Sequence, residues 1–154
     1  MVVVKPKTVV TMRVSGACPT HSRTDVSARD TKIMIDEPAE RGGTNLGPSP
    51  TETLLAALAG CTNRIGHKVA AANGVEFLEM NIVVEAKFDR RGVELSEDID
   101  VPFPQITTHI DVLTSANDEA IERVKRDLPK YCPISKVLRQ SGTNVTDVWA
   151  IRRS

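Results

Sequence analysis

Aromatic side chains are scarce in this chain of 154 residues, which contains three Phe, one Tyr and one Trp. So few rings offer no platform for stacking nucleic-acid bases, and a hydrophobic core has to consist mainly of Val, Ile, Leu and Ala. An excess of charge is lacking too, because 20 basic residues balance 20 acidic ones. Without a positive field to attract them, we expect neither nucleic acid nor a membrane surface as a partner.

Long hydrophobic runs are also missing. No segment reaches the roughly 20 apolar residues that cross a bilayer, and the N-terminus lacks the apolar stretch of a secretory signal. We therefore expect a cytoplasmic protein. With 40% hydrophobic residues, the chain is expected to form a single globular domain over residues 1–154 that buries a sizeable core.

Three cysteines are too few, and odd in number, for a framework of structural disulfides in a reducing compartment. The segment from Cys18 to His21 has the spacing of half a metal site, but no second Cys/His pair at suitable spacing follows it. We expect no metal and no cofactor, and we interpret Cys18 as a free thiol in a loop. Cys61 and Cys132 remain as catalytic or inert thiols.

The expected elements are strands, a long helix, further strands, two shorter helices and a last strand. The strands are expected at residues 2–4, 8–14, 32–36, 77–88, 106–112 and 143–151. Glycine and proline make segment 38–50 a loop, and segment 94–104 is expected to be another. This order predicts the α+β class with a mostly antiparallel sheet.

The long helix has a recognisable start and stop. Ser49 can cap it, Pro50 suits its first turn, and Glu52 completes a Ser-x-x-Glu capping box. Asn73-Gly74 is a typical end. Apolar residues recur between these limits at three- or four-residue spacing, namely Leu54, Leu58, Cys61, Ile65 and Val69. The cysteine of this stripe is therefore expected to face the core.

Two shorter helices are expected near the C-terminus. Asn117 begins the first, and Pro129 is expected to end it at residue 128. Pro133 suits the first turn of the second helix, which runs to residue 138 and has Cys132 as its cap residue. Unpaired N–H groups and the positive end of the helix dipole favour a thiolate at such a position.

A reactive Cys61 needs a cation nearby, because an apolar helix face raises the pKa of a thiol. Arg64, three residues later on nearly the same face, is the local candidate. His67 points about 240° away from Cys61 on a helix, which disfavours a Cys-His pair within it. The residues alone leave two interpretations open: a reactive pair of Cys61 and Cys132, or two inert side chains.

The chain resembles the family of osmotically inducible protein C (OsmC) and the organic hydroperoxide resistance proteins in two segments. The first, residues 42–61, reads Gly-Gly-Thr-x-x-Gly-Pro-Ser-Pro-x-Glu and then Leu-Leu-Ala-Ala-Leu-Ala-Gly-Cys. The second, residues 132–138, reads Cys-Pro-Ile-Ser-Lys-Val-Leu. The resemblance implies an intertwined homodimer, in which a mostly antiparallel sheet wraps around central helices that carry the cysteines, with active sites at the subunit interface.

The same resemblance implies a thiol-dependent peroxidase for organic hydroperoxides, acting in oxidative-stress defence. Cys61 would attack the peroxide to form a sulfenic acid, and Cys132 would condense with it to a disulfide. A dithiol such as a lipoyl group would then reduce that disulfide by exchange. The implied partners are a second copy of the chain, a small-molecule hydroperoxide and a dithiol reductant.

The family also uses an arginine to stabilise the thiolate and a glutamate to orient that arginine. Arg41 has the spacing of the osmotically inducible branch and is the first candidate, whereas Arg23 fits the hydroperoxide-resistance branch. Glu52 is the nearest equivalent of the glutamate, which the peroxidase branches carry one position earlier, where this chain has Thr51. This departure is typical of a general family member. It keeps two alternatives open: a non-catalytic dimeric binding protein for a small apolar or acyl ligand, and a thiol redox sensor.

Overall fold

The computed structural model of the protein describes residues 8–154, which divide into two compact units, 8–53 and 54–154. A three-stranded sheet forms the first unit, and a second three-stranded sheet with helices forms the other. The α+β class is therefore confirmed. The strand expected at residues 2–4 lies outside the described residues, and the single domain over residues 1–154 stays a prediction.

The first unit is an antiparallel meander of β1 (Ser15–Ala17), β2 (Thr24–Ala28) and β3 (Thr31–Ile35). The strand expected at 32–36 is confirmed as β3. The strand expected at 8–14 is wrong: these residues are β-branched and apolar, but they are exposed and have no neighbouring strand to pair with in the described chain. Sequence analysis missed β2, because its Thr, Asp and Ser are not typical of a strand.

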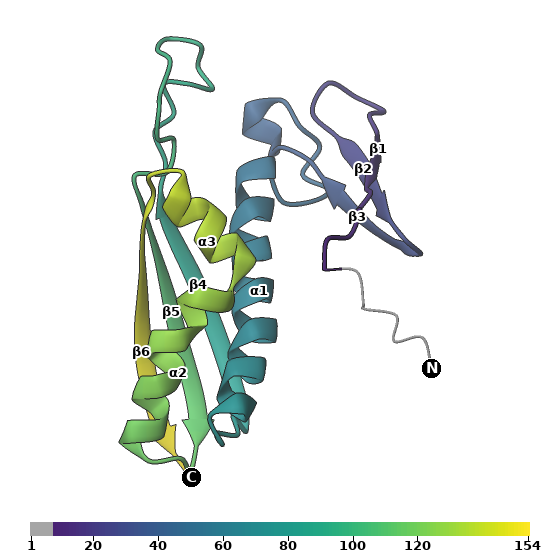
Figure 1. The fold of residues 1–154 in the computed structure, drawn as a ribbon. Helices are drawn as coiled ribbons and strands as arrows, with labels where there is room; N and C mark the ends of the chain where they lie inside the picture. Colours follow the sequence, from purple (N-terminus) through teal and green to yellow (C-terminus); the bar gives the residue numbers. More distant parts are fainter. Residues whose placement is uncertain (1–7) are drawn as a thin grey trace. The chain divides into compact units, whose positions relative to one another are not determined.

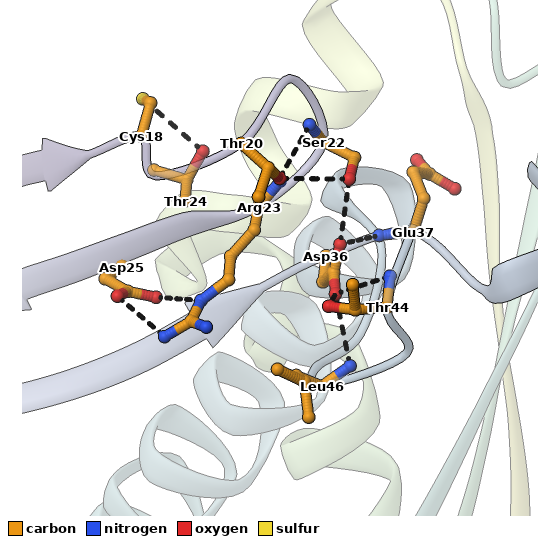
Figure 2. Close-up of polar contacts among 10 residues, drawn as sticks. All are labelled: Cys18, Thr20, Ser22, Arg23, Thr24, Asp25, Asp36, Glu37, Thr44 and Leu46. Atoms are coloured by element: carbon orange, nitrogen blue, oxygen red, sulfur yellow. Dashed lines mark hydrogen bonds and ion pairs between the residues drawn. The ribbon is translucent and has the colours of Figure 1, made fainter. Parts of the chain in front are cut away.

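One buried carboxylate organises the loop that follows β3 (Figure 2). Asp36 accepts hydrogen bonds from the hydroxyls of Thr44 and Ser22, the latter at 3.1 Å. It also accepts from the backbone N–H groups of Glu37 at 2.8 Å, Thr44 at 3.0 Å and Leu46 at 3.2 Å. These donors, the Thr44 hydroxyl foremost, hold the pKa of Asp36 well below its usual range. The carboxylate thus ties this loop to the turn before β2.

Two glycines of the same loop are required by close backbone packing. A Cβ at Gly43 would lie 1.8 Å from the carbonyl oxygen of Glu37, and one at Gly47 would lie 2.1 Å from that of Met34. Any larger residue would push the loop away from the end of β3. The predicted loop 38–50 is confirmed, with a short 3-10 turn, η1 (Ala39–Arg41), inside it.

Helix α1 (Pro50–Ala72) has the predicted start and stop. The Ser49 N–H donates to the Glu52 carboxylate at 2.7 Å, and the Glu52 N–H donates to the Ser49 hydroxyl at 3.3 Å, which completes the capping box. Gly74 follows the last turn with a φ of 69°. The predicted apolar stripe is confirmed, since all five of its residues are buried or half-buried.

No helix within residues 8–154 has the length and apolar character needed to cross a membrane.

The second sheet has the order β4 (Glu79–Lys87), β5 (Gln105–Thr114) and β6 (Asn144–Arg153). β4 and β5 are antiparallel, whereas β5 and β6 are parallel. Parallel neighbours need a crossover connection, which here consists of α2 (Asp118–Tyr131) and α3 (Pro133–Gln140) lying over the sheet (Figure 1). Three of the four strand pairings in residues 8–154 are antiparallel, as predicted.

The core of the second unit lies between the inward face of this sheet and the helices. Its fully buried members include Leu58, Ile106, Ile110, Val112, Ile121 and Val124. Side chains alternate along β5, so that every second residue from Ile106 onward is buried. The connection from β4 to β5 is the predicted loop, which projects beyond the ends of these strands (Figure 1).

Helix α2 is longer than predicted. Asn117 caps it as expected, accepting the Ala120 N–H at 2.9 Å. The prediction that Pro129 ends the helix is wrong, because the helix continues to Tyr131. Pro129 has no N–H, so the helix loses one backbone hydrogen bond there. The neighbouring Leu128 is buried, and its carbonyl oxygen accepts a hydrogen bond from the Cys132 N–H at 3.0 Å, which closes the last turn.

We expect the substitution Asp36→Asn to lower the midpoint of thermal unfolding at neutral pH, because an amide presents donors where this loop already supplies donors. Folding lowers the pKa of Asp36, so its contribution is fully present above the ordinary value of 3.8 and is lost as the pH falls through the lower folded value. Calorimetry of both chains at several pH values should show a deficit that shrinks in acid.

The matched control is Asp30→Asn, which changes an exposed aspartate in the turn between β2 and β3. We expect little effect of this substitution on the midpoint. An Asp36→Asn deficit that is equally large at pH 7 and at pH 3 would contradict the assigned role of the Asp36 charge.

Candidate active site

The structure brings together the two cysteines that the sequence motifs singled out. Cys61 lies in the middle of α1, and Cys132 is the residue that joins α2 to α3. The Cys132 thiol donates a hydrogen bond to the Cys61 sulfur, with 3.1 Å between the two Sγ atoms. A disulfide bond is about 2.05 Å long, so these are free thiols in direct contact.

Cys132 is 1% exposed, and this burial determines its protonation. Burial, assisted by the hydrogen bond to Cys61, raises the pKa of the Cys132 thiol from 9.0 to about 11. The backbone N–H groups of Ser135 and Ile134 at the start of α3 act in the opposite direction. The helix N-terminus favours a thiolate at Cys132, as expected, but the loss of hydration outweighs this effect on the pKa.

Cys61 is half-buried and is the more accessible of the two sulfurs. Within residues 54–154, its hydrogen-bond partner is the Cys132 thiol. Arg64, the local cation candidate, has an exposed side chain on α1. An accessible sulfur that accepts a hydrogen bond from a buried, protonated thiol can attack an electrophile, and the second thiol is then in place to react with the product.

Arg41 and Arg23, the two arginines that the resemblance suggested, are each paired with a carboxylate of the first unit. The Arg41 Nε lies 2.8 Å from Glu37 Oε2. Arg23 donates through Nε at 2.8 Å and through Nη2 at 2.9 Å to the two oxygens of Asp25 (Figure 2). A role of either arginine toward the Cys61 thiolate stays a prediction.

Glu52, the candidate for orienting the arginine, is engaged in helix capping. The Ser49 N–H and hydroxyl are the main causes that lower the pKa of Glu52, and the charge of Arg41 adds to them. Arg41 is thus close enough to influence Glu52 electrostatically, while the ion-pair partner of Arg41 is Glu37. The orienting role of Glu52 also stays a prediction.

A groove of about 440 Å³ opens between α1 and α2. Its wall includes Ile65, one helical turn after Cys61, and Tyr131, which precedes Cys132. Val69 and Ala72 extend its apolar side, and Lys68 and Asp127 are the charged residues at its rim. Within the described residues, no cluster of three His, Cys, Asp or Glu is arranged to hold a metal ion.

The family model of the OsmC-like proteins matches residues 43–146. The chain belongs to the OsmC-like protein family. The predicted resemblance is thereby confirmed, although a comparison with curated protein sequences gave no match.

Solved structures of OsmC-like proteins share this fold. The OsmC-like protein of Mycoplasma pneumoniae has a TM-score of 0.79 at 16% identity, over 93% of this chain and 98% of that one. An organic hydroperoxide resistance protein OsmC of Legionella pneumophila gives 0.66 at 18% identity, over 95% and 99%. The organic hydroperoxide resistance protein OhrB of Bacillus subtilis gives 0.60 at 20% identity, over 92% and 98%. At such identities the likeness shows the fold alone.

We expect the Cys132 thiol of this OsmC-like protein to ionise above 9.0 even without the Cys61 hydrogen bond, because burial is the main cause of its raised pKa. The absorbance of the thiolate near 240 nm measures this ionisation in a chain with Cys18→Ser and Cys61→Ser. A chain that also carries Cys132→Ser supplies the baseline and removes the contribution of tyrosine. A midpoint at or below 9.0 would show that the helix end outweighs burial after all.

Proposed function

We propose that this OsmC-like protein is a thiol-dependent peroxidase that reduces organic hydroperoxides in the cytoplasm, as part of oxidative-stress defence. The 3.1 Å contact between the sulfurs of Cys61 and Cys132 carries the proposal. Two-cysteine peroxide reduction needs a second thiol within reach of the sulfenic acid, and this contact supplies one. Membership of the OsmC-like family and the shared fold with organic hydroperoxide resistance proteins support it.

Cys61 is the attacking residue, because its side chain is half-exposed whereas Cys132 is buried. Its sulfur attacks one peroxide oxygen and the O–O bond breaks. The alcohol leaves with the proton that the Cys61 thiol gave up, and Cys61 becomes a sulfenic acid. The apolar stripe around Cys61 favours an alkyl hydroperoxide over hydrogen peroxide as the substrate.

Cys132 resolves this intermediate. Its sulfur attacks the sulfenic sulfur, an S–S bond forms, the S–O bond breaks, and the hydroxyl leaves as water with the Cys132 proton. The sulfurs have to approach from 3.1 Å to bonding distance, a change of about 1 Å. A dithiol such as a lipoyl group then reduces the disulfide by exchange and is itself oxidised. The expected assembly is an intertwined homodimer.

The groove between α1 and α2 favours a second candidate function. Its apolar side and volume of about 440 Å³ suit a small apolar or acyl ligand. In that case the protein is a non-catalytic, dimeric binding protein, and its thiols do not react with peroxide.

The first test is the fate of each thiol after one equivalent of an alkyl hydroperoxide. We expect a disulfide between Cys61 and Cys132, formed faster than with hydrogen peroxide, while Cys18 stays reduced. Mass spectrometry of unreduced peptides after alkylation locates the bond. If all three thiols stay reduced, the peroxidase proposal fails and the binding function becomes the better one.

Two variants assign the roles in this reaction, and Cys18→Ser serves as their control. Cys61→Ser is expected to abolish peroxide consumption, because the attacking sulfur is gone. Cys132→Ser is expected to consume one equivalent and then accumulate a sulfenic acid at Cys61, which dimedone traps. Undiminished peroxide turnover by Cys61→Ser would contradict the assignment of Cys61 as the attacking residue.

A further test concerns the cation that stabilises the Cys61 thiolate. A neighbouring positive charge favours the reactive thiolate, so losing it should slow Cys61 oxidation at pH 7 by about tenfold or more. We expect this loss in Arg41→Gln and little change in Arg90→Gln, which breaks an exposed ion pair with Glu94. A normal rate in Arg41→Gln, with a slow rate in Arg23→Gln or Arg64→Gln, would transfer the role to that residue.

A further inference from the structure

One carboxylate lies on the core-facing side of β6. Val145, Trp149 and Ile151 point from this strand into the core, and Asp147 has the same phase in the alternation. Its side chain is only 18% exposed. An acid at such a position is destabilising unless a partner compensates its charge.

That partner is Arg139 of α3. Its Nη2 lies 3.4 Å from Asp147 Oδ2. Burial raises the pKa of Asp147, and the charge of Arg139 opposes this more strongly than the hydroxyl of Thr108 on the adjacent strand. The Thr108 hydroxyl, although buried beside Asp147, makes no hydrogen bond of normal length within residues 8–154. The guanidinium is therefore the main compensating group.

The same guanidinium reaches back to the start of its own helix. Arg139 Nε donates to the hydroxyl of Ser135 at 3.1 Å, one turn earlier. Because Asp147 belongs to the sheet and Ser135 to the first turn of α3, this one side chain fastens the beginning of the helix to β6.

The first turn of α3 in turn surrounds Cys132. Ser135 is buried, and its backbone N–H acts on the Cys132 sulfur together with that of Ile134. The Lys136 N–H donates to the Cys132 carbonyl oxygen at 3.0 Å. Any rotation or shift of this turn therefore moves the Cys132 sulfur relative to Cys61 and changes how often the two sulfurs reach bonding distance.

We propose that Arg139 and Asp147 are positioning residues for Cys132, which hold the first turn of α3 so that the two sulfurs stay within bonding reach. The resolving role of Cys132 rests on the proposed function, whereas the control of the sulfur–sulfur distance does not. The pair touches neither the peroxide nor the reacting atoms, and it acts through Ser135.

A thiol–disulfide equilibrium tests this without any peroxide. In glutathione buffers, the reduced protein and oxidised glutathione exchange to give the Cys61–Cys132 disulfide and two reduced glutathione molecules. The full chain with Cys18→Ser is used, and alkylation with mass spectrometry gives the disulfide fraction. We expect Arg139→Gln to lower the equilibrium constant by about tenfold or more, because the sulfurs then meet less often.

Two further variants separate positioning from general stability. Ser135→Ala removes the link between Arg139 and the first turn while leaving the ion pair, so the equilibrium constant should fall with little change in the unfolding midpoint. Arg123→Gln is the matched control: its side chain is 38% exposed against 36% for Arg139, but its partner Glu119 is 86% exposed. We expect the control to leave the equilibrium unchanged.

The outcomes for the two proposals are distinct. A parent chain that forms the disulfide in glutathione buffer but not with peroxide would refute the peroxidase and leave the positioning role standing. Variants Arg139→Gln and Ser135→Ala with equilibrium constants within about twofold of the parent would overturn the positioning role, even if Arg139→Gln unfolds at lower temperature. A parent chain that forms no disulfide in either experiment would overturn both.

Discussion

The contact between a half-exposed and a fully buried sulfur is the interaction on which the proposed chemistry of this protein depends. The parallel pairing of β5 and β6 makes it possible, because it obliges the chain to return over the sheet through α2 and α3. Cys132 is the junction of these two helices. A junction that is buried in the core, rather than exposed as most helix connections are, can present its side chain to the cysteine of α1.

Burial also distinguishes the two thiols, because Cys132 is fully buried whereas Cys61 is half-exposed. A helix N-terminus stabilises a nearby anion, but this effect is modest and falls off within one turn. Removing a thiolate from water is costly, and at Cys132 this cost prevails over two backbone N–H groups, since the pKa rises to about 11. Cys132 therefore keeps its proton at neutral pH. It donates that proton in a hydrogen bond to Cys61 in the resting protein, and the same proton would leave with water when the disulfide forms.

Features of this fold that depend on local sequence could be predicted, and those that depend on distant partners could not. The capping box of Ser49 and Glu52 and the stripe of α1 involve residues only a few positions apart, so their spacing was sufficient. β2 is stabilised by its pairing with β1 and β3. The last turn of α2 is stabilised by the burial of Leu128, although Pro129 follows it. Sequence analysis did not single out Asp147, and its link through Arg139 to Cys132 appears only once α3 is packed on β6.

Arg41 and Arg23, the two candidate cations of the proposed mechanism, are held by their present partners to different degrees. Arg23 is 27% exposed and binds Asp25 with two parallel hydrogen bonds, the strongest geometry for a guanidinium and a carboxylate. Arg41 is 57% exposed and forms a single ion pair with Glu37, four residues earlier, in a solvated setting where such pairs contribute little. Leaving its present partner therefore costs Arg41 less than it would cost Arg23. Because the Asp36 hydrogen bonds and the close packing of Gly43 hold the backbone of the Arg41 loop, its side chain can change partner without the loop having to reorganise.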